Sequence, residues 1–320
     1  MTIVLTIFIN NILPIFLLVG LGYIFGRKLG PDINTLTKLN LYALVPVFTF
    51  VYLYTSDIPA DMLKVLAFAV IMLAACSALS LAVSRIMGFD KGKKYAFINS
   101  VIFYNSGNIG IPLITLVFSS APFIMDGQTP YLELALTSQI MILVTQNITT
   151  NSIGFYNAGR AKMDLRRSLK KILGVPTIYA VPAAFLLKLV PYDLTLLPVW
   201  PSLDYMRNAL VAVALLTLGV QIYRTKFDKL DKGVILSAFI RLVCGPAIAF
   251  VIIRMLSLDG VIAQAVLISS GVPTAVNTAL IAVDYDNYPG FASQTVLLST
   301  LLCTLTLPAV IYAARILFPV

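Results

Sequence analysis

The stretch Asn105-Ser106-Gly107-Asn108-Ile109-Gly110-Ile111-Pro112 lies at the centre of an apolar segment and is the most informative part of the sequence about the fold. It places two asparagines, two glycines and a proline within eight residues. Proline removes a backbone donor and clashes with the preceding turn of a helix, and an asparagine amide costs free energy in apolar surroundings unless it is paired. The stretch therefore predicts a broken helix that faces protein or a watery cavity. A simple proline kink with packed glycines is the alternative interpretation.

The composition around this stretch is that of a membrane protein. Of the 320 residues, 59% are hydrophobic and 12% are charged, against roughly 25% charged in an average soluble domain. The mean hydropathy is +0.92. These values exclude a soluble globular protein, a disordered chain and a nucleic-acid binder. Histidine is absent, so histidine-based catalysis and most transition-metal sites are excluded too. We expect no enzyme activity and no bound cofactor.

The chain divides into ten apolar segments, each near the length of a membrane-spanning helix. The sixth is the weakest, because Pro176 and Pro182 interrupt it. The three cysteines lie inside apolar segments and predict neither disulfides nor a metal site. The fold class expected is an all-α polytopic membrane protein. Its spans are 3–25, 36–54, 65–84, 96–118, 132–153, 173–190, 206–223, 234–256, 262–283 and 292–314.

Basic residues predict the orientation of these spans. The odd-numbered loops contain 16 of the 23 Lys and Arg residues, while the even-numbered loops contain Lys64, Lys188 and Arg254. Under the positive-inside rule the odd loops are cytoplasmic, so both termini face the outside of the inner (plasma) membrane. The net charge of +9 is then mainly a topology signal. A lipid-headgroup site in the basic stretch 160–171 is the alternative.

The two halves of the chain resemble each other weakly. The basic loop 157–172 separates five spans in 1–156 from five in 173–320. An odd number per half forces the halves into opposite orientations, as in the inverted repeats of secondary transporters. The ninth span contains Ser270-Gly271-Val272-Pro273-Thr274-Ala275-Val276-Asn277, which corresponds to the stretch in span four. Two discontinuous helices would then cross near the midplane and present their N-terminal N–H groups to an anion.

Further candidates lie near these two breaks. Gln139 and Gln294 occupy matching positions at the starts of spans five and ten, with interhelical hydrogen bonding as the alternative role. Arg241 is the one basic residue well inside a span. It is either a partner for a substrate carboxylate or a residue that snorkels or pairs with helix carbonyls. The candidate substrate-binding residues are Asn105, Gly107, Asn108, Gly110, Pro112, Gln139, Arg241, Pro273, Thr274, Asn277 and Gln294.

The chain resembles the bacterial branch of the auxin efflux carrier family. The resemblance covers essentially the whole chain and rests on the order and spacing of several motifs. These are the stretch 105–112, Ile12-Leu13-Pro14-Ile15-Phe16 with Gly20-Leu21-Gly22-Tyr23, Pro46, Leu216-Thr217-Leu218-Gly219, Pro273-Thr274-Ala275-Val276-Asn277-Thr278 and Gln294-Thr295-Val296-Leu297-Leu298-Ser299-Thr300.

This resemblance implies two inverted five-helix repeats with crossed helices at spans four and nine. It also implies a scaffold of spans 1, 2, 6 and 7 and a transport core of spans 3–5 and 8–10. The expected function is secondary or facilitative transport of a small organic anion, an auxin-like molecule or a carboxylate such as malate, by alternating access. A membrane sensor that binds without transporting is the alternative. Coupling to H⁺ or Na⁺ and assembly as a homodimer stay open.

Overall fold

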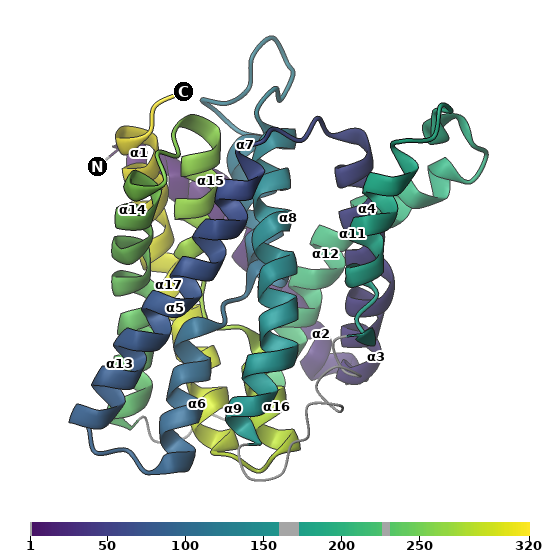
Figure 1. The fold of residues 1–320 in the computed structure, drawn as a ribbon. Coiled ribbons are helices and arrows are strands. Elements are labelled where there is room, and N and C mark those ends of the chain that lie inside the picture. Colours follow the sequence, from purple (N-terminus) through teal and green to yellow (C-terminus); the bar gives the residue numbers. More distant parts are fainter. Residues whose placement is uncertain (1, 160–172, 226–230) are drawn as a thin grey trace.

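The computed structural model describes residues 2–159, 173–225 and 231–320, and the regular structure in these ranges is helical (Figure 1). Six of the described helical segments are long and apolar enough to cross a membrane, and three shorter apolar helices accompany them. The α-helices are α1 (Thr2–Ile7), α2 (Leu13–Leu29), α3 (Ile33–Leu39), α4 (Val45–Thr55), α5 (Met62–Ile86), α6 (Lys91–Ile102), α7 (Ile111–Phe118), α8 (Leu132–Thr149), α9 (Phe155–Ala158), α11 (Thr177–Leu187), α12 (Trp200–Arg224), α13 (Lys232–Phe239), α14 (Gly245–Met255), α15 (Gly260–Ser270), α16 (Val276–Asp284) and α17 (Pro289–Leu317).

Wider π-helical turns interrupt several of these helices, and most of them have the same cause in the sequence. A proline stands at the second residue of the helix that follows η1, η2, η3 and η6, namely Pro14, Pro46, Pro112 and Pro246. Because proline has no N–H and clashes with the preceding turn, the helix widens there. The turns are η1 (Phe8–Ile12), η2 (Asn40–Leu44), η3 (Ser106–Gly110), η4 (Thr150–Gly154) and η6 (Ile240–Cys244).

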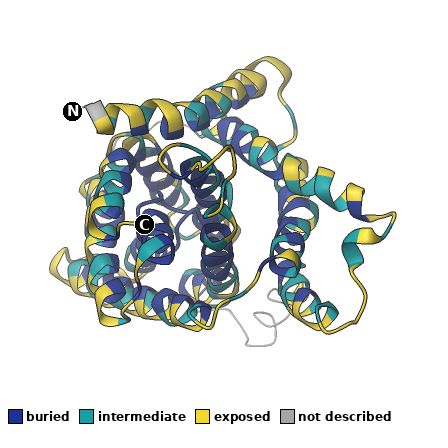
Figure 2. Ribbon diagram, turned by 90° about the horizontal axis from the view of Figure 1, so that it is seen from above, coloured by how far each residue is buried: buried dark blue, intermediate teal, exposed yellow. Residues whose placement is uncertain are grey.

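The outer surface of the helices is apolar. Buried residues lie on the inner faces of the helices and exposed residues on the outer faces (Figure 2). Among the exposed side chains are Leu17, Ile86 and Leu305, whose exposed fractions are 59%, 85% and 73%. Large apolar side chains on the outside of a helical bundle suit contact with lipid. Both termini lie at the same end of the molecule (Figure 1).

The described helices fall into two packed groups. In one group α2 packs along α12, and α4 packs against both α11 and α12. The other group contains α5 to α9 and α13 to α17, in which α5 contacts α6, α8 and α14, and α15 contacts α8 and α17. The α2–α12 contact is close enough that the backbones touch, because Gly22 faces Leu216 and Gly219 faces Val19. Small residues permit this approach.

Two helices are interrupted in the interior, and their unwound segments meet. Helix α6 ends at Ile102 before η3, and α15 ends at Ser270 before α16. The Asn105 N–H donates to the Pro273 carbonyl (2.8 Å), and the Ala275 N–H donates to the Phe103 carbonyl (3.0 Å). Tyr104 and Thr274 thus form an isolated antiparallel bridge. This pairing satisfies backbone groups that have no water to bind inside a membrane protein.

Asp90 fixes the start of α6, the first half of the interrupted helix. As the N-cap residue, its carboxylate accepts hydrogen bonds from the N–H groups of Gly92 (2.9 Å) and Lys93 (3.1 Å). It also accepts from the hydroxyl of Tyr288, the residue before α17, at 2.5 Å. The Tyr288 hydroxyl, and then the Lys93 N–H, hold the pKa of the Asp90 carboxyl below its usual value.

Replacing this cap gives a prediction about pH. We expect Asp90→Ala to lower the free energy of unfolding by about 1 kcal/mol. Because the pKa of Asp90 is lower in the folded protein, the stabilisation is present above the unfolded value of about 3.9 and is lost as the pH falls through the folded value. Melting temperatures of wild type and variant in detergent should differ at neutral pH and converge on acidification. An undiminished difference at about pH 2 would contradict the prediction.

Candidate functional site

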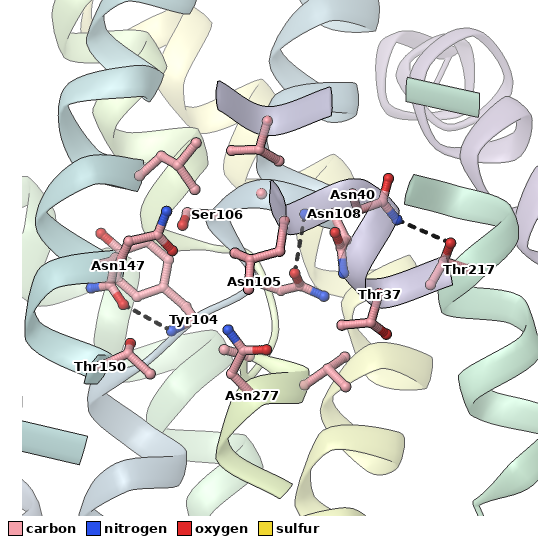
Figure 3. A pocket seen from close by; sticks show the side chains of 17 residues that line it. Thr37, Asn40, Tyr104, Asn105, Ser106, Asn108, Asn147, Thr150, Thr217 and Asn277 are labelled. Atoms are coloured by element: carbon pink, nitrogen blue, oxygen red, sulfur yellow. Dashed lines mark hydrogen bonds between the residues drawn. The ribbon is translucent and has the colours of Figure 1, made fainter. Parts of the chain in front are cut away.

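A polar pocket lies where the two interrupted helices meet the other group of helices. Its lining comes from the η2 region and α12 in one group, and from η3, α8, η4 and the start of α16 in the other (Figure 3). The cavity volume is about 70 Å³, enough for about two water molecules or a carboxylate group. The lining residues are Thr37, Asn40, Leu41, Val45, Tyr104, Asn105, Ser106, Gly107, Asn108, Leu143, Gln146, Asn147, Thr150, Thr217, Ala275, Val276 and Asn277.

The pocket is polar, but its lining contains no charged side chain. Amide groups dominate, and those of Asn105, Asn108 and Asn277 gather around the same opening (Figure 3). The side-chain nitrogens of Asn105 and Asn147 are buried without a hydrogen-bond partner in the described residues. A buried amide donor without an acceptor is costly. The side-chain carbonyl oxygen of Asn40 and the Tyr104 hydroxyl of the same lining are also buried without a described partner, so the side chains include both unpaired donors and unpaired acceptors.

Backbone donors add to these amides at the starts of two helices. The N–H groups of Gly107, Val276 and Asn277 have no acceptor among the described residues. Gly107 stands at the beginning of the helix formed by η3 and α7, and the other two are the first residues of α16. Helix N-termini carry partial positive charge and free N–H groups, so they bind anions. The pocket thus has the chemistry of an anion site.

Three side chains in and beside the pocket hold the unwound backbone in place. Gln139 donates through Nε2 to the Ser106 carbonyl (2.7 Å). Gln146 accepts from the Tyr104 N–H (3.3 Å), and Thr274 donates through its hydroxyl to the Ser100 carbonyl (2.7 Å). A Cβ at Gly110 would collide with Nε2 of Gln139, so a larger residue there would displace the Gln139 amide from the Ser106 carbonyl. These contacts supply hydrogen-bond partners to backbone groups that lose their helical partners where the helices are broken.

Comparison with known proteins shows the family of the chain. The chain matches the family model described as membrane transport protein in two segments, 7–164 and 161–311. The protein belongs to the auxin efflux carrier family of membrane transport proteins. It is also 23% identical over 309 residues to an uncharacterized transporter of Methanothermobacter thermautotrophicus (strain Delta H), a match that covers 93% of this chain and 96% of the relative. The resemblance seen in the sequence is thereby confirmed, and the chain is a multi-pass membrane protein.

The structure brings together only part of the expected site. Asn105, Gly107, Asn108 and Asn277 line the pocket. Four others lie behind it, where Gly110 and Pro112 pack in η3 and α7 and where Gln139 and Thr274 make the supporting hydrogen bonds. Pro273 contributes its carbonyl to the pairing of the unwound segments. Gln294 lines a separate cavity of about 380 Å³ between α12 and α16–α17, which shares Val276 with the pocket.

The position of Arg241 differs from the expectation of a substrate contact. It is absent from the pocket lining. Its guanidinium is fully buried, donates to the carbonyl oxygens of Val101 (3.0 Å) and Ser270, and lies 4.6 Å from the centre of the Tyr104 ring. Of the two roles left open by the sequence, the structure therefore shows the pairing with helix carbonyls. The basic stretch 160–171, the alternative lipid site, lies outside the described residues.

Several lining residues were not predicted from the sequence. Thr37, Asn40 and Thr217 belong to the other group of helices, where Asn40 donates through Nδ2 to the Thr217 hydroxyl at 3.0 Å. Asn40 is a buried amide in an apolar span six residues before Pro46, and this pattern is the signal that could have identified it. The other polar lining residues outside the candidate list are Tyr104, Ser106, Gln146, Asn147 and Thr150, and the apolar ones are Leu41, Val45, Leu143, Ala275 and Val276.

Proposed function

We propose that the protein carries a small organic anion, such as a short carboxylate, across the plasma membrane by alternating access. The observation that carries this proposal is the set of three unpaired N–H groups at two helix starts, in a pocket without a carboxylate. Broken helices with these properties hold the anionic group of the substrate in secondary transporters. Membership of a transporter family supports the same conclusion.

The proposed moving parts are the two packed groups of helices. The scaffold consists of spans 1, 2, 6 and 7, and the transport core of spans 3–5 and 8–10. The packing of α2 and α4 against α11 and α12 supports this division. So does the pocket, whose lining combines Asn40 and Thr217 of one group with Asn108 and Asn277 of the other. Movement of the core past the scaffold would expose the anion to each side in turn.

The proposed topology has ten spans in two inverted repeats, 1–156 and 173–320, joined by the basic loop 157–172. The meeting of two unwound segments from different halves, through the Tyr104–Thr274 bridge, supports this symmetry. The positive-inside rule then places both termini outside. Their position at the same end of the molecule agrees with an even number of spans (Figure 1).

Uptake into proteoliposomes tests the function directly. Purified protein is reconstituted and offered labelled malate, malonate, other short carboxylates and an indole acid under imposed proton, sodium and voltage gradients. We expect at least one anion to accumulate above the level of protein-free vesicles. Specific binding of an anion without uptake of any would contradict transport and favour the sensor.

The placement of the site is tested by Asn108→Ala. The side chain lies at the pocket and has no described hydrogen bond that the fold needs, so the variant should insert and fold normally. We expect uptake at low substrate concentration to fall about 10- to 150-fold, because loss of a hydrogen bond to a charged group weakens binding by about 1.5–3 kcal/mol. Initial uptake rates at matched protein amounts measure the effect. Unchanged uptake would place the substrate elsewhere.

A further inference from the structure

Arg241 is the one charged side chain among the buried residues of the described chain. Its guanidinium has no carboxylate partner there, since the three ion pairs of the described residues involve other side chains. An unpaired buried charge is costly, and charged residues inside membrane proteins mark functional positions. Arg241 does not line the pocket described above, but it lies behind one lining residue, Tyr104. Its role is therefore inferred from the groups that surround it.

Those surroundings are the carboxyl ends of the two interrupted helices. Arg241 donates through Nη1 to the carbonyl of Val101, in the last turn of α6, at 3.0 Å. It donates through Nη2 to the carbonyl of Ser270, the last residue of α15. The Tyr104 ring, in the unwound segment itself, covers the guanidinium at 4.6 Å. The carboxyl end of a helix carries partial negative charge. The one guanidinium therefore interacts favourably with the carboxyl ends of both helices.

The sequence leaves room for this arrangement. The guanidinium lies next to Gly245, one turn further along the same helix. A Cβ at Gly245 would lie 2.6 Å from Nη2 of Arg241. Gly245 follows directly after η6, the π-helical turn that contains Arg241. A larger residue at position 245 would push the guanidinium away from the Ser270 carbonyl. The glycine therefore helps to keep the charge at the helix ends.

Carbonyl oxygens at helix carboxyl ends, next to an aromatic face, are also ligands for small metal cations. Oxygen donors suit hard cations, and carriers with broken helices coordinate Na⁺ through such carbonyls. We propose that Arg241 is a built-in cation that takes the place of a coupling ion at the helix crossing, so that transport by this protein needs no Na⁺. The claim that transport needs no Na⁺ rests on the proposed function. The claim that the Arg241 cation stabilises the two helix ends does not.

The experiment compares wild type with Arg241→Ala and Arg241→Lys in two readouts. One is the melting temperature of detergent-purified protein in choline chloride, NaCl or millimolar guanidinium chloride. The other is anion uptake in the same salts. The matched control is Arg254→Ala, which removes an arginine that also donates to a helix-end carbonyl, that of Leu317, and lies over aromatic rings, but is exposed.

We expect wild-type uptake and melting to be the same in choline and in sodium. Arg241→Ala should take up anion at least about tenfold more slowly, because it loses hydrogen bonds from a charged group. Guanidinium should restore its uptake and raise its melting temperature, and Arg241→Lys should need no added cation. Guanidinium should change neither quantity in wild type or in Arg254→Ala.

Two outcomes would overturn the inference. One is a requirement of wild-type uptake for a Na⁺ gradient. The other is an Arg241→Ala protein that responds to neither guanidinium nor Na⁺ in melting temperature. If Arg241→Ala does not fold, anion uptake by wild type and by Arg241→Lys is compared in choline chloride. Loss of uptake in the lysine variant would then contradict a built-in cation. If wild type transports no anion, the transport proposal fails while the melting data still test Arg241.

Discussion

Uptake should fall at least about 100-fold when Asn277 is replaced by Asp, because like charges in close contact cost several kcal/mol. Asn277 is the second residue of α16, and its side chain lies at the pocket beside unpaired N–H groups. The introduced carboxylate would take the favourable interaction with the helix start and repel the substrate anion. The same interaction should keep the variant folded. Initial uptake rates and melting temperature together measure the two effects.

Asn34→Asp is the matched control for this substitution. Asn34 is also the second residue of a helix, α3, but its side chain is exposed and away from the pocket. The added charge should therefore leave uptake unchanged. Equal loss of uptake in both variants would show a general effect of charge, and normal uptake in Asn277→Asp would remove the pocket from the transport path.

The largest effect on stability is expected for Gly219→Ala. A Cβ at this position would lie 2.6 Å from the Tyr23 nitrogen and closer still to the Val19 carbonyl oxygen. Backbone atoms cannot move aside as a flexible side chain can, so α2 and α12 must separate. We expect a loss of about 1–3 kcal/mol in the free energy of unfolding. The melting temperature of the detergent-purified protein measures this change.

Gly20→Ala provides the comparison on the same helix pair. Gly20 lies on α2, and a Cβ there would meet no atom within 4 Å. Alanine is a better helix former than glycine by about 1 kcal/mol, so this variant should melt at or above the temperature of wild type. If Gly219→Ala melted as high as Gly20→Ala, the close α2–α12 contact would not stabilise the protein.

The helix breaks could be predicted because their causes are local. Asparagine, glycine and proline in an apolar segment disfavour a continuous helix wherever the segment lies, and the chain is unwound around Tyr104 and Thr274. The family could be predicted for a similar reason, since its motifs are read along the chain. The membrane-embedded character follows from composition, and the helical character from the length of the apolar segments.

The rest of the site depends on contacts between distant segments. Asn40 and Thr217 line the pocket because η2 and α12, which lie far apart in the sequence, meet beside it, and no pattern in the sequence says that these two segments pack together. The same limit applies to Arg241. Its depth in a span was predicted, but its direction toward the carbonyls of Val101 and Ser270 is set by the packing of three helices.

The anion pocket is tested most directly by parallel reconstitution of wild type and Asn277→Asp. Both proteins are offered the labelled carboxylate that wild type takes up fastest, at equal amounts of folded protein. We predict that wild type accumulates the anion and that the variant stays at the level of protein-free vesicles. Equal uptake by the two proteins, or no uptake of any carboxylate by folded wild type, would contradict the account.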